Sequence, residues 1–142
     1  MAASPPEVFA VLAEGWLYSD WVVGTSHVRA VDQHWPDAGT RLHHATGVWP
    51  LVVRDETVVE NLVPDHRLTL KAQGWPLGEA RVVIELNASG GGTTVSLRET
   101  PISGPGKWLH NPLLEFLLVR RNVEALARLK ALVERHSEPA DA

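Results

Sequence analysis

Two ionisable residues, Glu99 and His44, occur on strand faces that are otherwise apolar. Successive side chains of a strand point to opposite faces, so Glu99 shares a face with Val95 and Leu97, and His44 shares one with Leu42. An ionisable group that faces a dry cavity has a shifted pKa and can transfer a proton at neutral pH. Glu99 and His44 are therefore candidate catalytic residues. The alternative is a structural or solvated role, in which Glu99 pairs with an arginine, the candidates being Arg41, Arg81 and Arg98.

Aromatic side chains form a second group of candidates. The 142 residues include six tryptophans but only one tyrosine and two phenylalanines. Most of these rings occur near the ends of predicted elements, where an indole offers a large apolar surface and one N–H group to a ligand. Ordinary packing under loops is the alternative. Together with two residues of the last helix, the predicted ligand-binding set is Tyr18, Trp21, Trp35, Trp49, Trp75, Trp108, Leu118 and Asn122.

Several other kinds of site lack their motifs. His43 and His44 are adjacent in a predicted strand, so they point to opposite faces and cannot chelate one ion together, and there is no HExxH. Gly90–Gly92 precedes a strand and is typical of a hairpin turn, not of a dinucleotide-binding loop. The segment 104–107 lacks the length and the Ser or Thr of a P-loop, and no G-x-S-x-G occurs. We therefore expect neither a metal ion nor a cofactor.

Composition narrows the function further. With 13 Lys and Arg against 17 Asp and Glu, the net charge of -4 offers nucleic acid no basic surface. No cysteine is present, which excludes disulfides and thiolate chemistry. The longest apolar runs fall far short of the roughly 18 residues that span a bilayer. Met1–Glu7 lacks the basic and apolar regions of a secretory signal, so a cytoplasmic location is expected.

The elements that would position these residues begin with two short helices. Ser4 is a candidate N-cap, Pro5 suits the first helical position, and Glu7 can complete a capping box, so a helix is predicted from here to Gly15. Residues 16–23 can supply a second short helix that ends at Gly24.

Six strands are predicted next, because short alternating segments are separated by turn residues as in an antiparallel meander. The predicted strands are Ser26–Val31, Thr40–Val48, Leu51–Val63, Arg67–Gln73, Gly78–Asn87 and Gly92–Thr100. The fifth alternates clearly, with Ala80, Val82, Ile84 and Leu86 on one face. One face of the sheet is therefore expected to be covered.

A long helix is predicted from Asn111, as N-cap, and Pro112 to about His136. Apolar residues recur at helical spacing along this helix and form one stripe, which must pack against an apolar surface. The predicted sheet is large enough to provide that surface. The stripe consists of Leu114, Leu118, Asn122, Ala125, Leu126, Leu129 and Val133. A single domain over residues 1–136 with a polar tail at 137–142 follows. The fold class is α+β: a curved antiparallel sheet of six or seven strands around a C-terminal helix.

This order of elements resembles the helix-grip fold of the START-like superfamily, and specifically the polyketide cyclase/dehydrase and lipid-transport (SRPBCC) families. The segments that carry the resemblance are Ser4–Leu12 with Trp21, Trp35–Thr40, Gly91–Val95 and Arg121–Lys130. They look like the family's "PPEeVfavL", "wp.vGt", "GGT" and "RN.eaL.rLk" motifs and span nearly the whole chain. The resemblance implies a cavity between the sheet and the last helix.

The chain departs from the family pattern at its start, where members usually carry a strand before the first helix. Met1–Ala3 is too short to supply one. Either the natural start lies further upstream or the sheet lacks an edge strand. In the second case an unpaired edge favours a homodimer.

Two functions follow from the resemblance. The first is binding of a hydrophobic small molecule, such as a lipid, a polyketide-like or an aromatic compound, in the cavity. The alternative is a cyclase or dehydratase that uses Glu99 or His44 for proton transfer without a cofactor. A third hypothesis is an interaction module that works through the sheet edge or through the charged face of the long helix.

Overall fold

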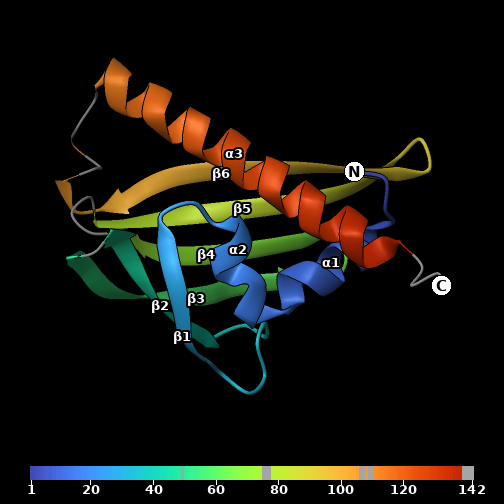
Figure 1. Ribbon diagram of the computed structural model, residues 1–142, viewed down its shortest axis with the longest axis horizontal. Coiled ribbons are helices and arrows are strands. Elements are labelled where there is room, and N and C mark those ends of the chain that lie inside the picture. Colours follow the sequence, from blue (N-terminus) through green and yellow to red (C-terminus); the bar gives the residue numbers. More distant parts are fainter. Residues whose placement is uncertain (49, 75–77, 106–107, 109–110, 139–142) are drawn as a thin grey trace.

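The computed structural model describes residues 1–48, 50–74, 78–105, 108 and 111–138. Six strands form one antiparallel sheet, in which each strand pairs with the next in the chain. The strands are β1 (Thr25–Val31), β2 (Arg41–Val48), β3 (Leu51–Val63), β4 (Arg67–Gly74), β5 (Gly78–Ser89) and β6 (Gly92–Ser103). The helices are α1 (Pro5–Ala13), the 3-10 helix η1 (Gly15–Leu17), α2 (Tyr18–Trp21) and α3 (Pro112–Ser137). Figure 1 shows all helices on one face of the curved sheet, as predicted for an α+β helix-grip fold.

The strand boundaries follow the predicted ones closely, and the largest difference is in the β5–β6 hairpin. Both strands are longer than expected, because their pairing continues from Ser89 opposite Gly92 to Glu79 opposite Ser103. The two-residue turn consists of Gly90 and Gly91, with φ angles of 56° and 82°. Positive φ at both positions gives a turn whose twist matches that of the flanking strands.

The N-terminal helix begins as its sequence predicts. The backbone N–H and the hydroxyl of Ser4 both donate hydrogen bonds to the Glu7 carboxylate, over 2.7 and 2.8 Å. Pro5 occupies the first helical position, where its missing N–H costs nothing. The buried residues Val8, Val11 and Leu12 then attach α1 to the core.

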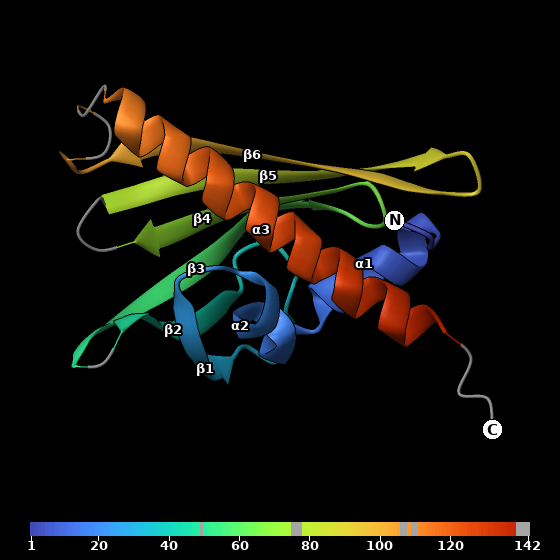
Figure 2. The same ribbon diagram turned by 45° about the horizontal axis from the view of Figure 1, so that its top comes forward.

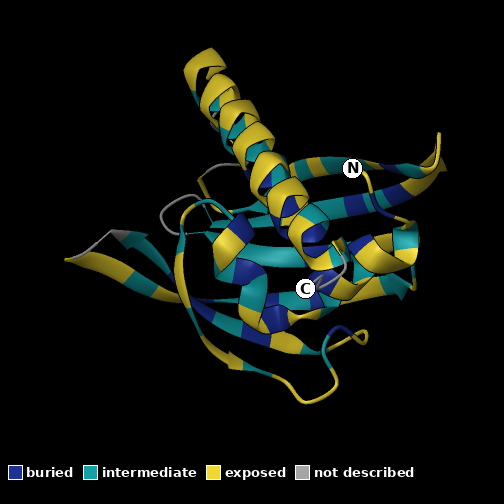
Figure 3. Cartoon of the chain, turned by 45° about the vertical axis from the view of Figure 1, so that its right-hand side comes forward, coloured by how far each residue is buried: buried dark blue, intermediate teal, exposed yellow. Residues whose placement is uncertain are grey.

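The long helix α3 crosses the sheet diagonally and is divided into two unlike halves (Figure 2). In its C-terminal half, Ala125, Leu129, Leu132 and Val133 are buried in the core. In its N-terminal half most residues are exposed, and Figure 3 shows the contrast along the helix. None of the helices in the described part of the chain combines the length and the apolar character needed to cross a bilayer.

The first three residues lie against β6. The Met1 amino group donates to the Thr93 carbonyl over 2.8 Å, and the Thr93 N–H donates to the Met1 carbonyl over 3.0 Å. The Thr93 hydroxyl donates to the carbonyl of the buried Ala3 over 2.7 Å. Met1–Ala3 thus covers a short part of the β6 edge, and a homodimer through the remainder of that edge stays a prediction.

Candidate functional site

A cavity of about 180 Å³ lies between the helix-covered face of the sheet, α2 and the N-terminal half of α3. Its lining is mainly apolar and includes Trp21, Leu70, Val82, Leu97 and Leu118. An apolar cavity of about 150 Å³ is large enough to bind benzene. This space therefore admits a molecule of one or two rings.

Six of the predicted site residues meet at this cavity. Tyr18 and Trp21 come from α2, His44 from β2, Glu99 from β6, and Leu118 and Asn122 from α3. The α2 helix is short, but both of its aromatic residues are buried, and their rings meet edge to face with centroids 5.5 Å apart. Helical spacing on α3 and strand alternation on β2 and β6 were sufficient to predict the face on which the other four side chains lie.

Two of the remaining aromatic candidates, Trp35 and Trp108, do not line the cavity. Trp35 is partly buried against the core, beside Gly15 and Val31, which places its ring between the first helices and β1. Trp108 is 78% exposed and is not among the cavity-lining residues. The expectation that rings near segment ends converge on the cavity is thus corrected for these two. Trp49 and Trp75 lie outside the described residues.

Polar side chains form a continuous chain on one wall of the cavity. The Thr46 hydroxyl and His44 Nδ1 are 3.2 Å apart, and His44 Nε2 lies 3.0 Å from the hydroxyl oxygen of Thr57. That oxygen lies 3.2 Å from the phenol oxygen of Tyr18. The Tyr18 ring also stacks on the His44 ring, with centroids 5.5 Å apart.

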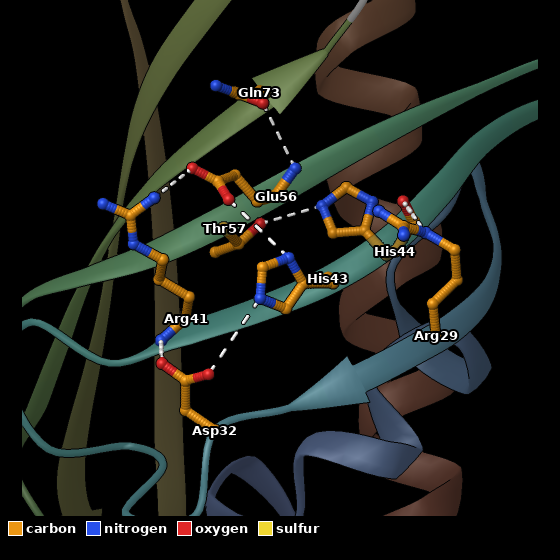
Figure 4. Close-up of polar contacts among 8 residues, drawn as sticks. All are labelled: Arg29, Asp32, Arg41, His43, His44, Glu56, Thr57 and Gln73. Atoms are coloured by element: carbon orange, nitrogen blue, oxygen red, sulfur yellow. Dashed lines mark hydrogen bonds and ion pairs between the residues drawn. The ribbon is translucent and has the colours of Figure 1, made fainter.

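The two adjacent histidines have opposite environments, as strand alternation predicts (Figure 4). The His43 ring lies on the open face, 3.6 Å from the Glu56 carboxylate and 4.0 Å from that of Asp32. His44 is buried on the helix-covered face, and its ring reaches Thr57. Only His44 is thus available to a molecule in the cavity.

Burial shifts the pKa values of His44 and Tyr18, the two residues of the polar chain that carry rings. Loss of water around His44 lowers its pKa, and the nearby Arg29 and His43 act in the same direction. The buried Asp55, directly across the β2–β3 pair, opposes this effect without reversing it. Burial likewise raises the pKa of Tyr18. At neutral pH both side chains are therefore uncharged.

Folding stability should depend on this neutral histidine. Below pH 6.5 the unfolded chain protonates His44 while the folded chain resists, so the free energy of unfolding falls as the pH drops from 7 towards 5. The slope from one proton is at most about 1.4 kcal/mol per pH unit. Denaturant titrations of the parent and of His44→Gln at several pH values measure it, and the variant should show the shallower slope. His66→Gln, at an exposed position, is the matched control, and equal slopes for the two variants would contradict the prediction.

The carboxylate of Glu99 forms an ion pair with the guanidinium of Arg121 on α3, and both residues line the cavity. The three arginines considered from sequence do not pair with Glu99. They lie on the open face, where Arg41 binds Glu56, Arg81 binds Glu60 and Arg98 binds Glu85. Strand alternation explains this, because each arginine is adjacent in sequence to a residue that points to the covered face. The arginine side chain therefore points to the opposite, open face.

Sequence reasoning missed three residues of the site. Thr57 is fully buried, and alternation with Val59 would have placed it on the covered face. Thr46 stands two residues after His44 and shares its face. Arg121 is not part of the predicted apolar stripe of the helix, yet its side chain is only partly exposed and lines the cavity. No pattern in the sequence indicated that Glu99 and Arg121 would meet.

Across the described parts of the chain, no three histidine or acidic side chains lie close enough together to hold a metal ion.

Residues 1–134 match the sequence profile of the family described as polyketide cyclase/dehydrase and lipid transport. The chain belongs to this family. No curated protein gives a significant match to it.

Solved structures similar to this family member share its fold at low sequence identity. Protein CV1439 from Chromobacterium violaceum is 19% identical, with a TM-score of 0.67 over 94% of this chain and 92% of its own. Ara h 8.0201 is 12% identical, with a TM-score of 0.72 over 97% and 93%. The di-domain ARO/CYC StfQ from the steffimycin biosynthetic pathway is 14% identical, with a TM-score of 0.72 over 97% of this chain and 49% of StfQ. At these identities the likeness concerns the fold alone.

Proposed function

We propose that this family member binds a small, neutral, hydrophobic molecule of one or two rings in the cavity under α3. The apolar lining of the 180 Å³ cavity is the observation that carries the proposal. Such a lining favours an apolar ligand, and a few polar groups on one wall give it orientation. Membership of a family described by polyketide cyclisation and lipid transport agrees with a ligand of this kind.

The charges around the cavity support a neutral ligand. Glu99 is neutralised by Arg121, and the Glu79 carboxylate lies 3.9 Å from the Lys71 ammonium group. His44 is uncharged for the reason given above. Among the described lining residues, each formal charge thus has an opposite charge beside it. A charged ligand would lose its water without gaining a counter-ion.

Filling the cavity tests this proposal. Leu118→Trp places a large ring into the space, whereas Leu117→Trp adds the same ring at a neighbouring exposed position of α3. With 2-naphthol as the probe, calorimetric titration should show a Kd raised at least about tenfold by Leu118→Trp, a loss of roughly 1.4 kcal/mol. Leu117→Trp should leave the Kd within about twofold of the parent value. Equal effects of the two variants, or no binding by the parent protein, would contradict the proposal.

A second candidate function is proton-transfer catalysis on the bound molecule, of the cyclase or dehydratase type. The observation that favours it is the polar chain through His44, since the rest of the covered wall is largely apolar. Glu99 is less suited to such a role, because its carboxylate is occupied by the hydrogen bond from the Arg121 guanidinium.

A further inference from the structure

The N-terminal half of α3 is apolar on its outer side as well as on the side that lines the cavity. Phe116, Val119 and Val123 are each more than half exposed. One helical turn takes 3.6 residues, so Phe116 and Val123, each two residues after the cavity-lining Leu114 and Arg121, point to the opposite side of the helix. Figure 3 shows this half of α3 exposed. A helix that is apolar all round is normally covered all round.

The outer apolar residues have the spacing of a two-stranded coiled coil. Phe116, Val119, Val123 and the half-buried Leu126, here called the outer stripe, follow one another at intervals of three, four and three residues. These are the a and d positions of a heptad. Valine at an a position with leucine at the next d position, as in Val123 and Leu126, favours two parallel helices. The exposed Lys130 occupies the following a position, so the outer stripe ends before it.

The charges beside the outer stripe match those of a second copy of α3. Glu115 and Arg120 are exposed and flank Phe116 on opposite sides, at the g and e positions. The ion pairs that α3 forms in the described part of the chain use Arg121 and Arg128 instead. The Arg120 guanidinium lies over the Phe116 ring, 5.8 Å from its centre. In a parallel helix pair a g residue lies beside the e residue five positions later in the other helix, so Glu115 meets the second copy's Arg120.

An antiparallel pair does not fit these charges. There g residues face g residues and e residues face e residues, so Glu115 lies beside Glu115 of the second copy and Arg120 beside Arg120. Like charges in contact oppose association. The parallel pair is also sterically open, because the outer stripe points away from the sheet and the two sheets then lie on opposite sides of the helix pair (Figure 2).

We infer that the protein forms a parallel dimer in which the outer stripe of one copy packs against the outer stripe of a second copy. The inference goes beyond the proposed binding function and does not depend on a ligand. The helix is already held by the core residues of its C-terminal half, so no helix has to form on association. The contact extends over only about three turns, and a micromolar dimer is therefore expected.

The dimer has a consequence for the cavity. Leu114 and Leu118 line the cavity from the same turns of α3 that carry the outer stripe on their other side. Few residues attach these turns to the rest of the domain, since the buried residues of α3 begin at Ala125. A second copy packed on the outer side thus holds this wall of the cavity in place.

A concentration series tests the dimer. Sedimentation of the parent protein between about 1 μM and about 1 mM should show conversion of the 15.6 kDa monomer into a species of twice that mass. Val119→Glu places a charge in the centre of the contact and should raise the dimer Kd at least about a hundredfold. Leu117→Glu makes a similar change at an exposed position outside the outer stripe and should leave the Kd within about threefold. Circular dichroism confirms that each variant is folded.

Exchange of the flanking charges tests the orientation. In a parallel dimer, Glu115→Lys alone and Arg120→Glu alone each bring like charges together, so each should raise the Kd about tenfold. The double variant restores opposite charges and should return the Kd to within about threefold of the parent value. A mixture of the two single variants should form a heterodimer, since all of its pairs join opposite charges. An antiparallel pair predicts no loss in the single variants.

Introduced thiols test the register, because the chain has no cysteine of its own. In a parallel pair every residue of the outer stripe meets its own counterpart, so both Phe116→Cys and Val123→Cys should form an interchain disulfide on mild oxidation. In an antiparallel pair only a residue at the twofold axis can do so. Leu117→Cys is the control, and on a non-reducing gel it should remain largely monomeric.

The outcomes decide the inference independently of the binding function, since none of the outer-stripe residues lines the cavity. A parent protein that is monomeric at about 1 mM overturns the inference, also if the monomer binds phosphatidylcholine vesicles instead. A dimer that survives Val119→Glu overturns it and assigns the contact to another surface, such as the β6 edge. A dimer that ignores the charge exchange overturns the parallel arrangement. Loss in Val119→Glu together with recovery in the double charge variant supports the inference.

Discussion

Leu129→Ala is expected to lower the free energy of unfolding by about 2–5 kcal/mol. Leu129 is 0% exposed and lies in the half of α3 that packs into the core, beside Ala125 and Val133. Removing its side chain forfeits the burial of the apolar atoms and leaves a hole that the rigid sheet cannot close. The loss should fall on the attachment of α3, and therefore on the whole helix-grip arrangement.

Urea denaturation of the parent and the variant measures this loss as a change in midpoint at constant m-value. Val123→Ala is the matched control on the same helix, because Val123 is 63% exposed and its truncation should cost about 0.5 kcal/mol or less. A loss below about 1 kcal/mol for Leu129→Ala would mean that α3 contributes little to the stability of the sheet.

Trp21→Ala is expected to have two large effects, one on folding and one on binding. The Trp21 ring is buried, meets Tyr18 edge to face, and lines the cavity. Its removal should cost about 3–5 kcal/mol of unfolding free energy. The affinity for 2-naphthol should fall by about 1–3 kcal/mol, because an aromatic contact in a desolvated pocket is lost.

The two effects of Trp21 can be separated. Trp21→Phe retains an aromatic ring on α2 and should recover most of the stability, while the ligand still loses part of its contact surface. Trp16→Ala is the control, since Trp16 is 56% exposed and is not a lining residue. Denaturation and calorimetric titration are carried out on each variant. An unchanged Kd in folded Trp21→Ala would assign Trp21 to the core alone.

The fold could be predicted from sequence because local and global signals agree along most of the chain. The bounds of β3 were predicted to the residue, Ser4 and Glu7 form the predicted N-terminal contact, and α3 begins after Asn111, whose side chain accepts from the N–H of Leu113. Each of these is set by neighbours within a few residues, where strand alternation and helix capping operate. The family match over residues 1–134 confirms the resemblance that the motifs indicated.

The site could be predicted only in part, because a cavity is made by residues distant in the chain. Alternation and helical spacing aimed His44, Glu99, Leu118 and Asn122 correctly at the covered face. They could not reveal that Glu99 meets Arg121, since that contact depends on the angle at which α3 crosses β6. Tryptophan content alone did not identify the cavity-lining residues. An indole that packs against β1, as in Trp35, cannot be distinguished in the sequence from an indole that packs against a ligand.

The division of α3 into two halves also bears on how such a domain can evolve. Residues that anchor the helix, such as Leu129 and Val133, are separate from those that shape the cavity, such as Leu114 and Leu118. Substitutions in the cavity half can alter which molecule is accepted while the anchoring half retains most of the folding free energy. One scaffold can thus diversify its ligand preference in small steps without passing through unstable intermediates.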